Sequence, residues 1–81
     1  MRIRVLLFAR LRELAGTAQR TLELAAGARV ADAWRALAGD DPQLAALANS
    51  TRAALNGRIA GSSDALADGD ELAFLPPAGG G

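Results

Sequence analysis

Most of the side chains that enzymes use for covalent or acid–base chemistry are missing from this 81-residue chain. It contains no cysteine and no histidine, and all nine of its basic residues are arginines. A thiol nucleophile, the commonest general base and the amine needed for a Schiff base are therefore excluded. Most routes to catalysis by side chains of this chain are therefore closed.

The carboxylate of Gly81 remains as a reactive group. Gly79 and Gly80 precede it, and residues without a Cβ atom can pass through a narrow channel and adopt any backbone angle needed there. Pro76 and Pro77 favour a stiff, extended segment, and the six residues from Pro76 could reach roughly 20 Å. This pattern predicts a mobile arm that offers its carboxylate to an adenylating enzyme. The alternative is a frayed terminus or a cloning remnant.

Composition excludes several other classes of function. Nine arginines balance nine carboxylates, so the net charge is zero, whereas nucleic-acid and membrane-surface binders normally carry a basic excess. The longest apolar run, residues 5–9, is too short to span a bilayer. The N-terminal residues lack the apolar core of a signal peptide, so we expect a cytoplasmic protein that binds neither nucleic acid nor membrane.

Hydrophobic periodicity predicts four main strands, a short hairpin strand and one long helix. The strands are expected at residues 2–8, 19–24, 52–56, 58–59 and 71–75, the helix at 30–38, and shorter helical turns at 9–16 and 43–48. The second strand is predicted to run antiparallel to the first, and the first to lie beside the last. This arrangement is an α+β roll, although ferredoxin-like folds and small barrels give a similar pattern.

The two faces of the predicted sheet differ in what covers them. Ile3, Val5 and Leu7 alternate on one face, and we expect Leu72 and Phe74 to join them against the helix. The opposite face then carries an apolar patch made of Leu6, Phe8, Ile59, Ala73 and Leu75. An apolar patch beside a mobile arm is typical of a docking surface, with incidental exposure as the alternative.

Three other features have structural interpretations. Trp34 lies on the apolar stripe of the helix and is predicted to belong to the core. Arg29 stands at the expected N-cap of that helix, where it is a poor capping residue. Asp68-Gly69-Asp70 supplies two carboxylates without further spaced ligands, which predicts a turn and no metal site.

Several segments resemble the small subunit of molybdopterin synthase. Residues 8–16 (FARLRELAG) resemble the family's FA-x-x-RE-x-x-G stretch. Residues 54–56 (ALN) and 66–81 (LADGDELAFLPPAGGG) are similar to its VN and L-x-DGDEVAF-x-PPV-x-GG segments. The likeness covers nearly the whole chain, although residues 39–50 match only loosely. Gly79 replaces a common Ser or Thr, and Leu75 stands where an aromatic residue is often found.

This resemblance implies a ubiquitin-like β-grasp fold with a mixed sheet and one main helix across one face. The domain would span residues 1–75, followed by a flexible tail over 76–81. The family carries sulfur for molybdenum cofactor biosynthesis. An adenylyltransferase similar to ubiquitin activators consumes ATP to form an acyl-adenylate on the last glycine, and a sulfur donor converts it to a thiocarboxylate. No cofactor is bound by the carrier itself.

The resemblance also implies partners and site residues. The large subunit of molybdopterin synthase, in a heterotetramer, accepts the tail and uses its sulfur to build the dithiolene of molybdopterin from precursor Z. By position, Gly81 bears the sulfur, and Gly79 and Gly80 form the inserted tail. The residues that fall at partner contacts are Phe8, Arg12, Ile59, Leu75, Pro76 and Pro77.

Three alternative functions stay open. The sulfur carrier of thiamine synthesis also ends in Gly-Gly, but it is typically shorter and lacks the FA-x-x-RE and Pro-Pro segments. A ubiquitin-like protein modifier would join the same carboxylate to a lysine of another protein. The third alternative is a non-catalytic β-grasp interaction domain with an inert tail.

Overall fold

The computed structural model describes residues 1–39 and 41–76. In this part of the chain, helices and strands follow the order expected from periodicity. Their bounds are β1 (Arg2–Leu7), α1 (Ala9–Ala15), β2 (Gln19–Glu23), α2 (Val30–Ala38), α3 (Pro42–Ala45), β3 (Arg52–Leu55), β4 (Arg58–Ala60) and β5 (Glu71–Leu75).

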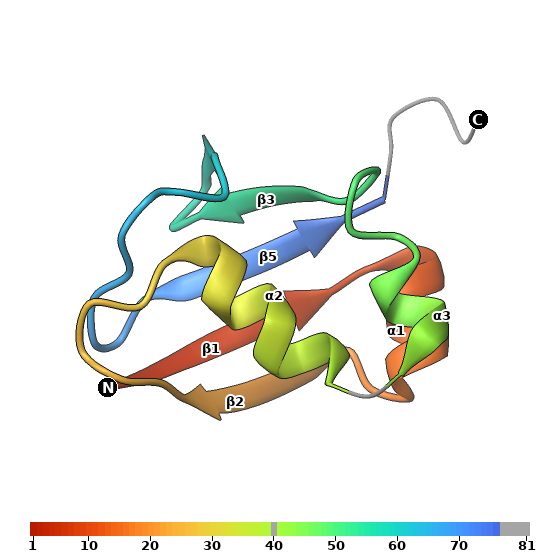
Figure 1. Ribbon diagram of the computed structural model, residues 1–81, viewed down its shortest axis with the longest axis horizontal. Coiled ribbons are helices and arrows are strands. Elements are labelled where there is room, and N and C mark those ends of the chain that lie inside the picture. Colours follow the sequence, from red (N-terminus) through yellow and green to blue (C-terminus); the bar gives the residue numbers. More distant parts are fainter. Residues whose placement is uncertain (40, 77–81) are drawn as a thin grey trace.

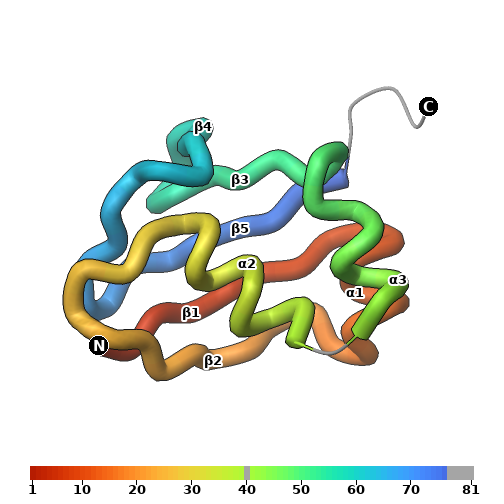
Figure 2. The backbone as a smooth tube through the Cα atoms, in the orientation of Figure 1, coloured from red at the N-terminus to blue at the C-terminus, as the bar shows by residue number. Residues whose placement is uncertain are grey.

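The five strands form one mixed sheet in the order β2-β1-β5-β3-β4. β1 runs antiparallel to β2 and parallel to β5, while β3 is antiparallel to both β5 and β4 (Figure 1). The predicted adjacency of the first and last strands is therefore confirmed. Figure 2 shows the short β4 at the edge beyond β3.

The core lies between the sheet and α2, which crosses one face of it (Figure 1). The predicted inward set is confirmed, because Ile3, Val5, Leu7, Leu72 and Phe74 are each at most 2% exposed. From the helix, its buried residues Val30, Ala33, Leu37 and Ala38 pack into the same cluster. Leu11 of α1, Leu44 of α3, Ala53 of β3 and the loop residue Leu66 complete it.

Local signals in the sequence explain where several elements end. α1 stops at Gly16, which has a φ of 76°, a left-handed value that glycine adopts without strain. The predicted tight hairpin between β3 and β4 is confirmed, since Asn56 and Gly57 both have positive φ angles, 50° and 85°.

The start of α2 is better capped than its sequence predicted. Arg29 offers no side-chain acceptor, but its backbone N–H donates to Oδ2 of Asp32 at 2.8 Å. The carboxylate of the third helical residue thus accepts a hydrogen bond from the backbone N–H of the N-cap residue. In the following segment, Asp41 caps α3 by accepting from the amides of Gln43 and Leu44, and Pro42 occupies the first turn.

Trp34 requires a correction. It is only partly buried, although the helical stripe predicted a core position. Its ring meets that of Phe74 edge to face, with centroids 5.1 Å apart and planes at 72°. The indole lines a groove between α2 and the β3–β4 side of the sheet, so part of it stays open to solvent.

Candidate functional site

The sheet face opposite α2 carries a continuous apolar row. Leu6 of β1 is paired with Ala73 of β5, Ala73 with Ala54 of β3, and Ala54 with Ile59 of β4. Directly paired residues of neighbouring strands project from the same face, so these four side chains line up across the sheet. We call this row, together with Phe8 and Leu75, the docking face.

The end of the docking face lies beside the start of the tail. Leu75 is paired with Arg52, one residue beyond the pair of Phe74 with Ala53. Phe8 directly follows Leu7, which is the partner of Phe74 in β1. The exposed large hydrophobic side chains of the described chain are Phe8, at 45%, and Ile59, at 74%. Two exposed apolar side chains, one on β4 and one directly after β1, give a partner a broad apolar contact on the docking face.

Two ion pairs border this face near the start of β1, one to β5 and one to β2. Arg4 Nη2 lies 3.0 Å from Oε2 of its cross-strand partner Glu71, and Arg2 Nε lies 2.6 Å from Oε1 of Glu23. The hydrogen bond to Glu23, aided by Coulombic attraction to the same carboxylate, raises the pKa of Arg2. Arginine is already cationic at neutral pH, so this contact is a polar border and no pH switch.

Arg12 lies one helical turn after Phe8 on α1 and is exposed. Its amide donates to the carbonyl of Phe8 at 3.4 Å, and its carbonyl accepts from Gly16 at 2.9 Å. Its guanidinium takes part in none of the ion pairs that the structure records within residues 1–39 and 41–76. Arg12 is thus placed close to the docking face, and its role as a partner contact stays a prediction.

The predicted reactive group lies outside the described residues. Gly81, together with Gly79, Gly80 and Pro77, belongs to the part of the chain that the structure does not describe. Pro76 is the last residue that the structure describes; it is partly buried and directly follows Leu75. Leu75, the last residue of β5, is therefore the residue of the docking face that lies next to Pro76 in the chain (Figure 1).

The predicted turn at Asp68-Gly69-Asp70 is confirmed, and its carboxylates have structural partners. Asp68 Oδ1 accepts from the amide of Arg2 at 2.7 Å, and Asp70 Oδ2 accepts from the amide of Ala67 at 2.7 Å. Within the described ranges, acidic side chains do not gather with others into a group that could hold a metal ion. The two carboxylates of Asp68-Gly69-Asp70 therefore hold the turn in place against the start of β1.

Asn56 completes that arrangement in a way that sequence reasoning missed. Its Nδ2 donates to Oδ1 of Asp70 at 3.0 Å, and its Oδ1 accepts from the amide of Glu71 at 2.9 Å. The β3–β4 turn is thereby clamped to the start of β5. The Asn-Gly pair indicated only a tight turn, because the partners of the asparagine side chain lie 14 and 15 residues further along the chain.

No helix in the described residues is long and apolar enough to cross a bilayer.

Comparison with known proteins identifies related chains of the same size. The sequence pattern of the ThiS family matches residues 5–81. A molybdopterin synthase sulfur carrier subunit from Chlamydomonas reinhardtii is 40% identical over 83 residues, and the alignment covers 100% of both chains.

Solved structures share the fold. The small archaeal modifier protein 1 of Haloferax volcanii superposes with a TM-score of 0.85 at 34% identity, covering 95% of this chain and 98% of that one. A ubiquitin-like protein from Caldiarchaeum subterraneum gives a TM-score of 0.57 at 20% identity over 99% of this chain and 100% of that one, a likeness of fold alone. The expected ubiquitin-like β-grasp fold is confirmed.

Proposed function

The chain belongs to the ThiS family, and from its full-length likeness to a molybdopterin synthase sulfur carrier subunit we propose that it is the sulfur-carrier subunit of molybdopterin synthase. One observation carries the proposal. The apolar row from Leu6 to Ile59 continues to Leu75, directly before the segment that ends in Gly81. A domain built this way can hold a partner with its sheet and deliver the end of its chain to that partner's active site. The full-length likeness to a sulfur carrier subunit supports the same assignment.

In this proposal the chain supplies the Gly81 carboxylate and no catalytic side chain. An adenylyltransferase binds ATP, and an oxygen of the carboxylate attacks the α-phosphorus, which releases pyrophosphate and leaves an acyl-adenylate. Sulfur at the oxidation level of hydrosulfide, delivered by a donor protein, then attacks the acyl carbon and displaces AMP. The product is a terminal thiocarboxylate. Neither step needs a cysteine, histidine or lysine of this chain.

The large subunit of molybdopterin synthase is the proposed acceptor. It binds the docking face, receives the glycine tail in its active site and uses the sulfur to build the dithiolene of molybdopterin from precursor Z. Phe8, Ile59 and Leu75 supply apolar contact area, while Arg12 offers a charge at the rim. Gly79 and Gly80 have no side chain to obstruct a narrow passage.

The decisive experiment co-expresses the chain with an adenylyltransferase of ubiquitin-activator type and a sulfur donor, and weighs the product by mass spectrometry. We expect a gain equal to the difference between one sulfur and one oxygen atom. Deleting Gly81 should abolish sulfur transfer and molybdopterin formation while leaving the circular dichroism spectrum unchanged. If the shortened chain still supported molybdopterin formation, the tail chemistry would be wrong.

A role as a protein modifier is the second candidate. It is favoured by the 34% identity and shared fold with small archaeal modifier protein 1. The same mass measurement separates the two, because a modifier would appear as an adduct joined through its C-terminus to a lysine of another protein. A conjugate without any thiocarboxylate would favour the modifier.

A further inference from the structure

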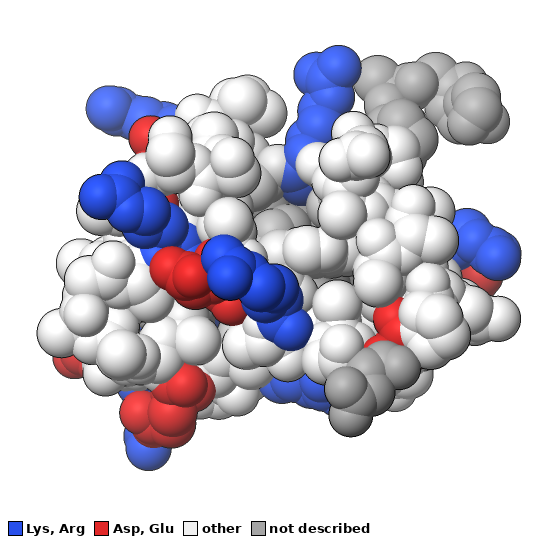
Figure 3. All heavy atoms as spheres, in the orientation of Figure 1, with Lys and Arg blue, Asp and Glu red and all other residues white. Residues whose placement is uncertain are grey.

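A groove runs between α2 and the β3–β4 side of the sheet, on the face that the helix covers. It encloses about 510 Å³. Its walls include Val30 and Trp34 from the helix and Ala53 and Phe74 from the sheet. Val30, Ala53 and Phe74 are buried core residues, so Trp34 is the partly buried side chain of these four at the edge of the groove. Figure 3 shows this side of the molecule, with arginine side chains standing around a hollow.

The rim of the groove is cationic. Arg35 and Arg52 line it, and no carboxylate is among its lining residues in the described chain. Arg35 also bonds Oδ1 of Asp32 at 3.0 Å, yet its side chain is 75% exposed. Arg52 is exposed and enters no ion pair recorded within residues 1–39 and 41–76. A chain of zero net charge thus has an uncompensated positive charge at this groove.

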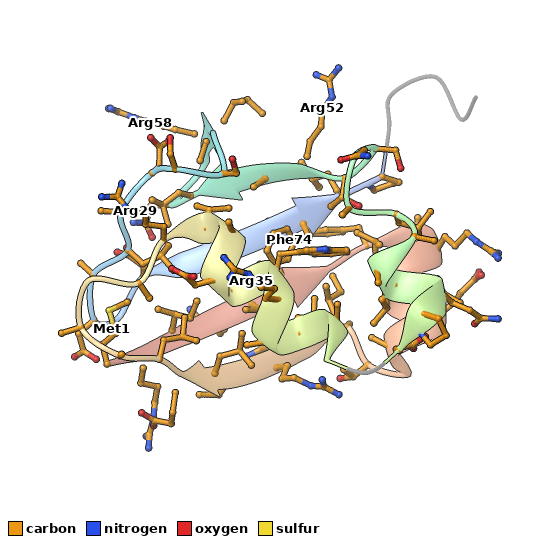
Figure 4. The ribbon with its side chains drawn as sticks, in the orientation of Figure 1. Met1, Arg29, Arg35, Arg52, Arg58 and Phe74 are labelled. Atoms are coloured by element: carbon orange, nitrogen blue, oxygen red, sulfur yellow. The ribbon has the colours of Figure 1, made fainter. Side chains whose placement is uncertain are left out.

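Nearby charges strengthen the asymmetry. Figure 4 shows Arg29 near the start of α2, Arg35 on the helix, and Arg52 and Arg58 extending outward from the β3–β4 edge. The guanidinium of Arg29 donates to the backbone carbonyl of Ser63, which carries no negative charge. Asp64 is the acidic residue of this loop, and its Oδ2 accepts from the amide of Gly61 at 2.9 Å. With Asp32, the partner of Arg35, included, the four arginines at positions 29, 35, 52 and 58 compare with two carboxylates, those of Asp32 and Asp64.

We propose that this groove binds a short segment of a partner protein in which apolar side chains are flanked by carboxylates. A volume of about 510 Å³ lies within the range of about 300–1,000 Å³ that ligand sites occupy. The aromatic and aliphatic walls match an apolar anchor, and arginine forms two-pronged hydrogen bonds with carboxylates. Charge complementarity thus selects an acidic segment over a basic one.

Binding in the groove would be separate from the carrier function of the docking face and tail. The groove and the docking face lie on opposite faces of the sheet, although two of the groove's lining residues border both: Ile59 of the edge strand β4, and Arg52, which is paired with Leu75. A partner held in the groove would leave the row from Leu6 to Ala54 open to the large subunit. The groove can therefore recruit a protein while the docking face and tail engage another.

Trp34, the single tryptophan of the chain, reports on the groove by its fluorescence. The probe is a blocked peptide, Asp-Asp-Leu-Leu-Asp-Asp, titrated into the full chain. Two further peptides replace either the leucines by serines or the aspartates by lysines. We expect a saturable change in Trp34 emission with the first peptide, and binding at least about tenfold weaker with each of the others.

Arg52→Glu should raise the Kd of the acidic peptide at least about tenfold, because a charge-assisted contact becomes a repulsion. Arg10→Glu is the matched control, since Arg10 is exposed on α1, outside the groove, and the change in net charge is the same. If both variants lost the same affinity for the acidic peptide, the effect would come from the net charge of the protein and not from the groove, and the proposal would be overturned. The proposal would also be overturned if the serine peptide bound as tightly as the leucine peptide, or if the acidic peptide caused no saturable change in Trp34 emission. These measurements involve no sulfur, so their failure leaves the carrier function untouched.

Discussion

Asn56 shows how a single polar side chain positions the candidate site. Its amide group bonds Asp70 on one side and the backbone of Glu71 on the other, and its own φ of 50° belongs to the hairpin turn. Glu71 begins β5, the strand that leads to Leu75 and the tail. The asparagine therefore connects the β3–β4 hairpin to β5, the strand that ends at Leu75.

We expect Asn56→Gly to lower the free energy of unfolding by about 1–2 kcal/mol, because glycine accepts the positive φ but removes both side-chain hydrogen bonds. Urea unfolding followed by circular dichroism measures the change. Asn49→Gly is the matched control, since it adds the same freedom to the unfolded chain at an exposed turn position. Equal destabilisation in both variants would show that the side-chain bonds contribute nothing.

The docking face is formed by several strands together, since no single strand contains it. β1, β5, β3 and β4 each contribute one residue to the apolar row. β2 continues the same face with polar residues, because Gln19 is paired with Leu6 and Thr21 with Arg4. The face thus has an apolar part near the tail and a polar part away from it, which defines the side on which a partner is expected to bind.

Leu75→Glu and Ile59→Glu should each weaken binding to the large synthase subunit at least about tenfold, since both place a charge in an apolar contact. Thr21→Glu is the control, because Thr21 is exposed on the polar part of the same sheet face. Isothermal titration calorimetry with the purified large subunit gives the three affinities. A loss for Thr21→Glu as large as for the other two would contradict the assigned position of the docking face.

At the scale of the whole molecule, a small core supports two exposed surfaces. A domain of this size is expected to unfold with about 4–12 kcal/mol, from about 0.05–0.15 kcal/mol per residue. Both surfaces depend on the same cluster, because Phe74 touches Trp34 at the groove while its neighbours Ala73 and Leu75 belong to the docking face.

Leu72→Ala tests that dependence. Leu72 is fully buried at the centre of the sheet, so the truncation should lower the free energy of unfolding by about 2–5 kcal/mol. Its cross-strand neighbour Leu55 is only partly buried, and Leu55→Ala should cost clearly less. Thermal unfolding of both variants checks the order. A larger loss at Leu55 would mean that the core is centred elsewhere than between β5 and α2.

Much of the fold could be predicted because its signals are local. The alternation of Ile3, Val5 and Leu7 assigned the buried face of β1, and the glycines at 16 and 57 assigned two of the chain reversals. The burial of Trp34 was predicted wrongly, because the spacing of apolar residues along a helix indicates the direction of a side chain but not how much of the sheet covers it.

The sequence by itself determined which chemistry is available to this protein. A chain without cysteine, histidine or lysine has no thiol, imidazole or side-chain amine for catalysis, and that conclusion needs no coordinates, whereas the reactive role of the Gly81 carboxylate stays a prediction. Only the tertiary structure decided that Leu6, Ala73, Ala54 and Ile59 form one row, that Asn56 reaches Asp70, and that a groove opens beside Trp34. The physical reason is that strand register and helix placement depend on packing between distant segments, whereas residue type and periodicity are properties of each segment alone.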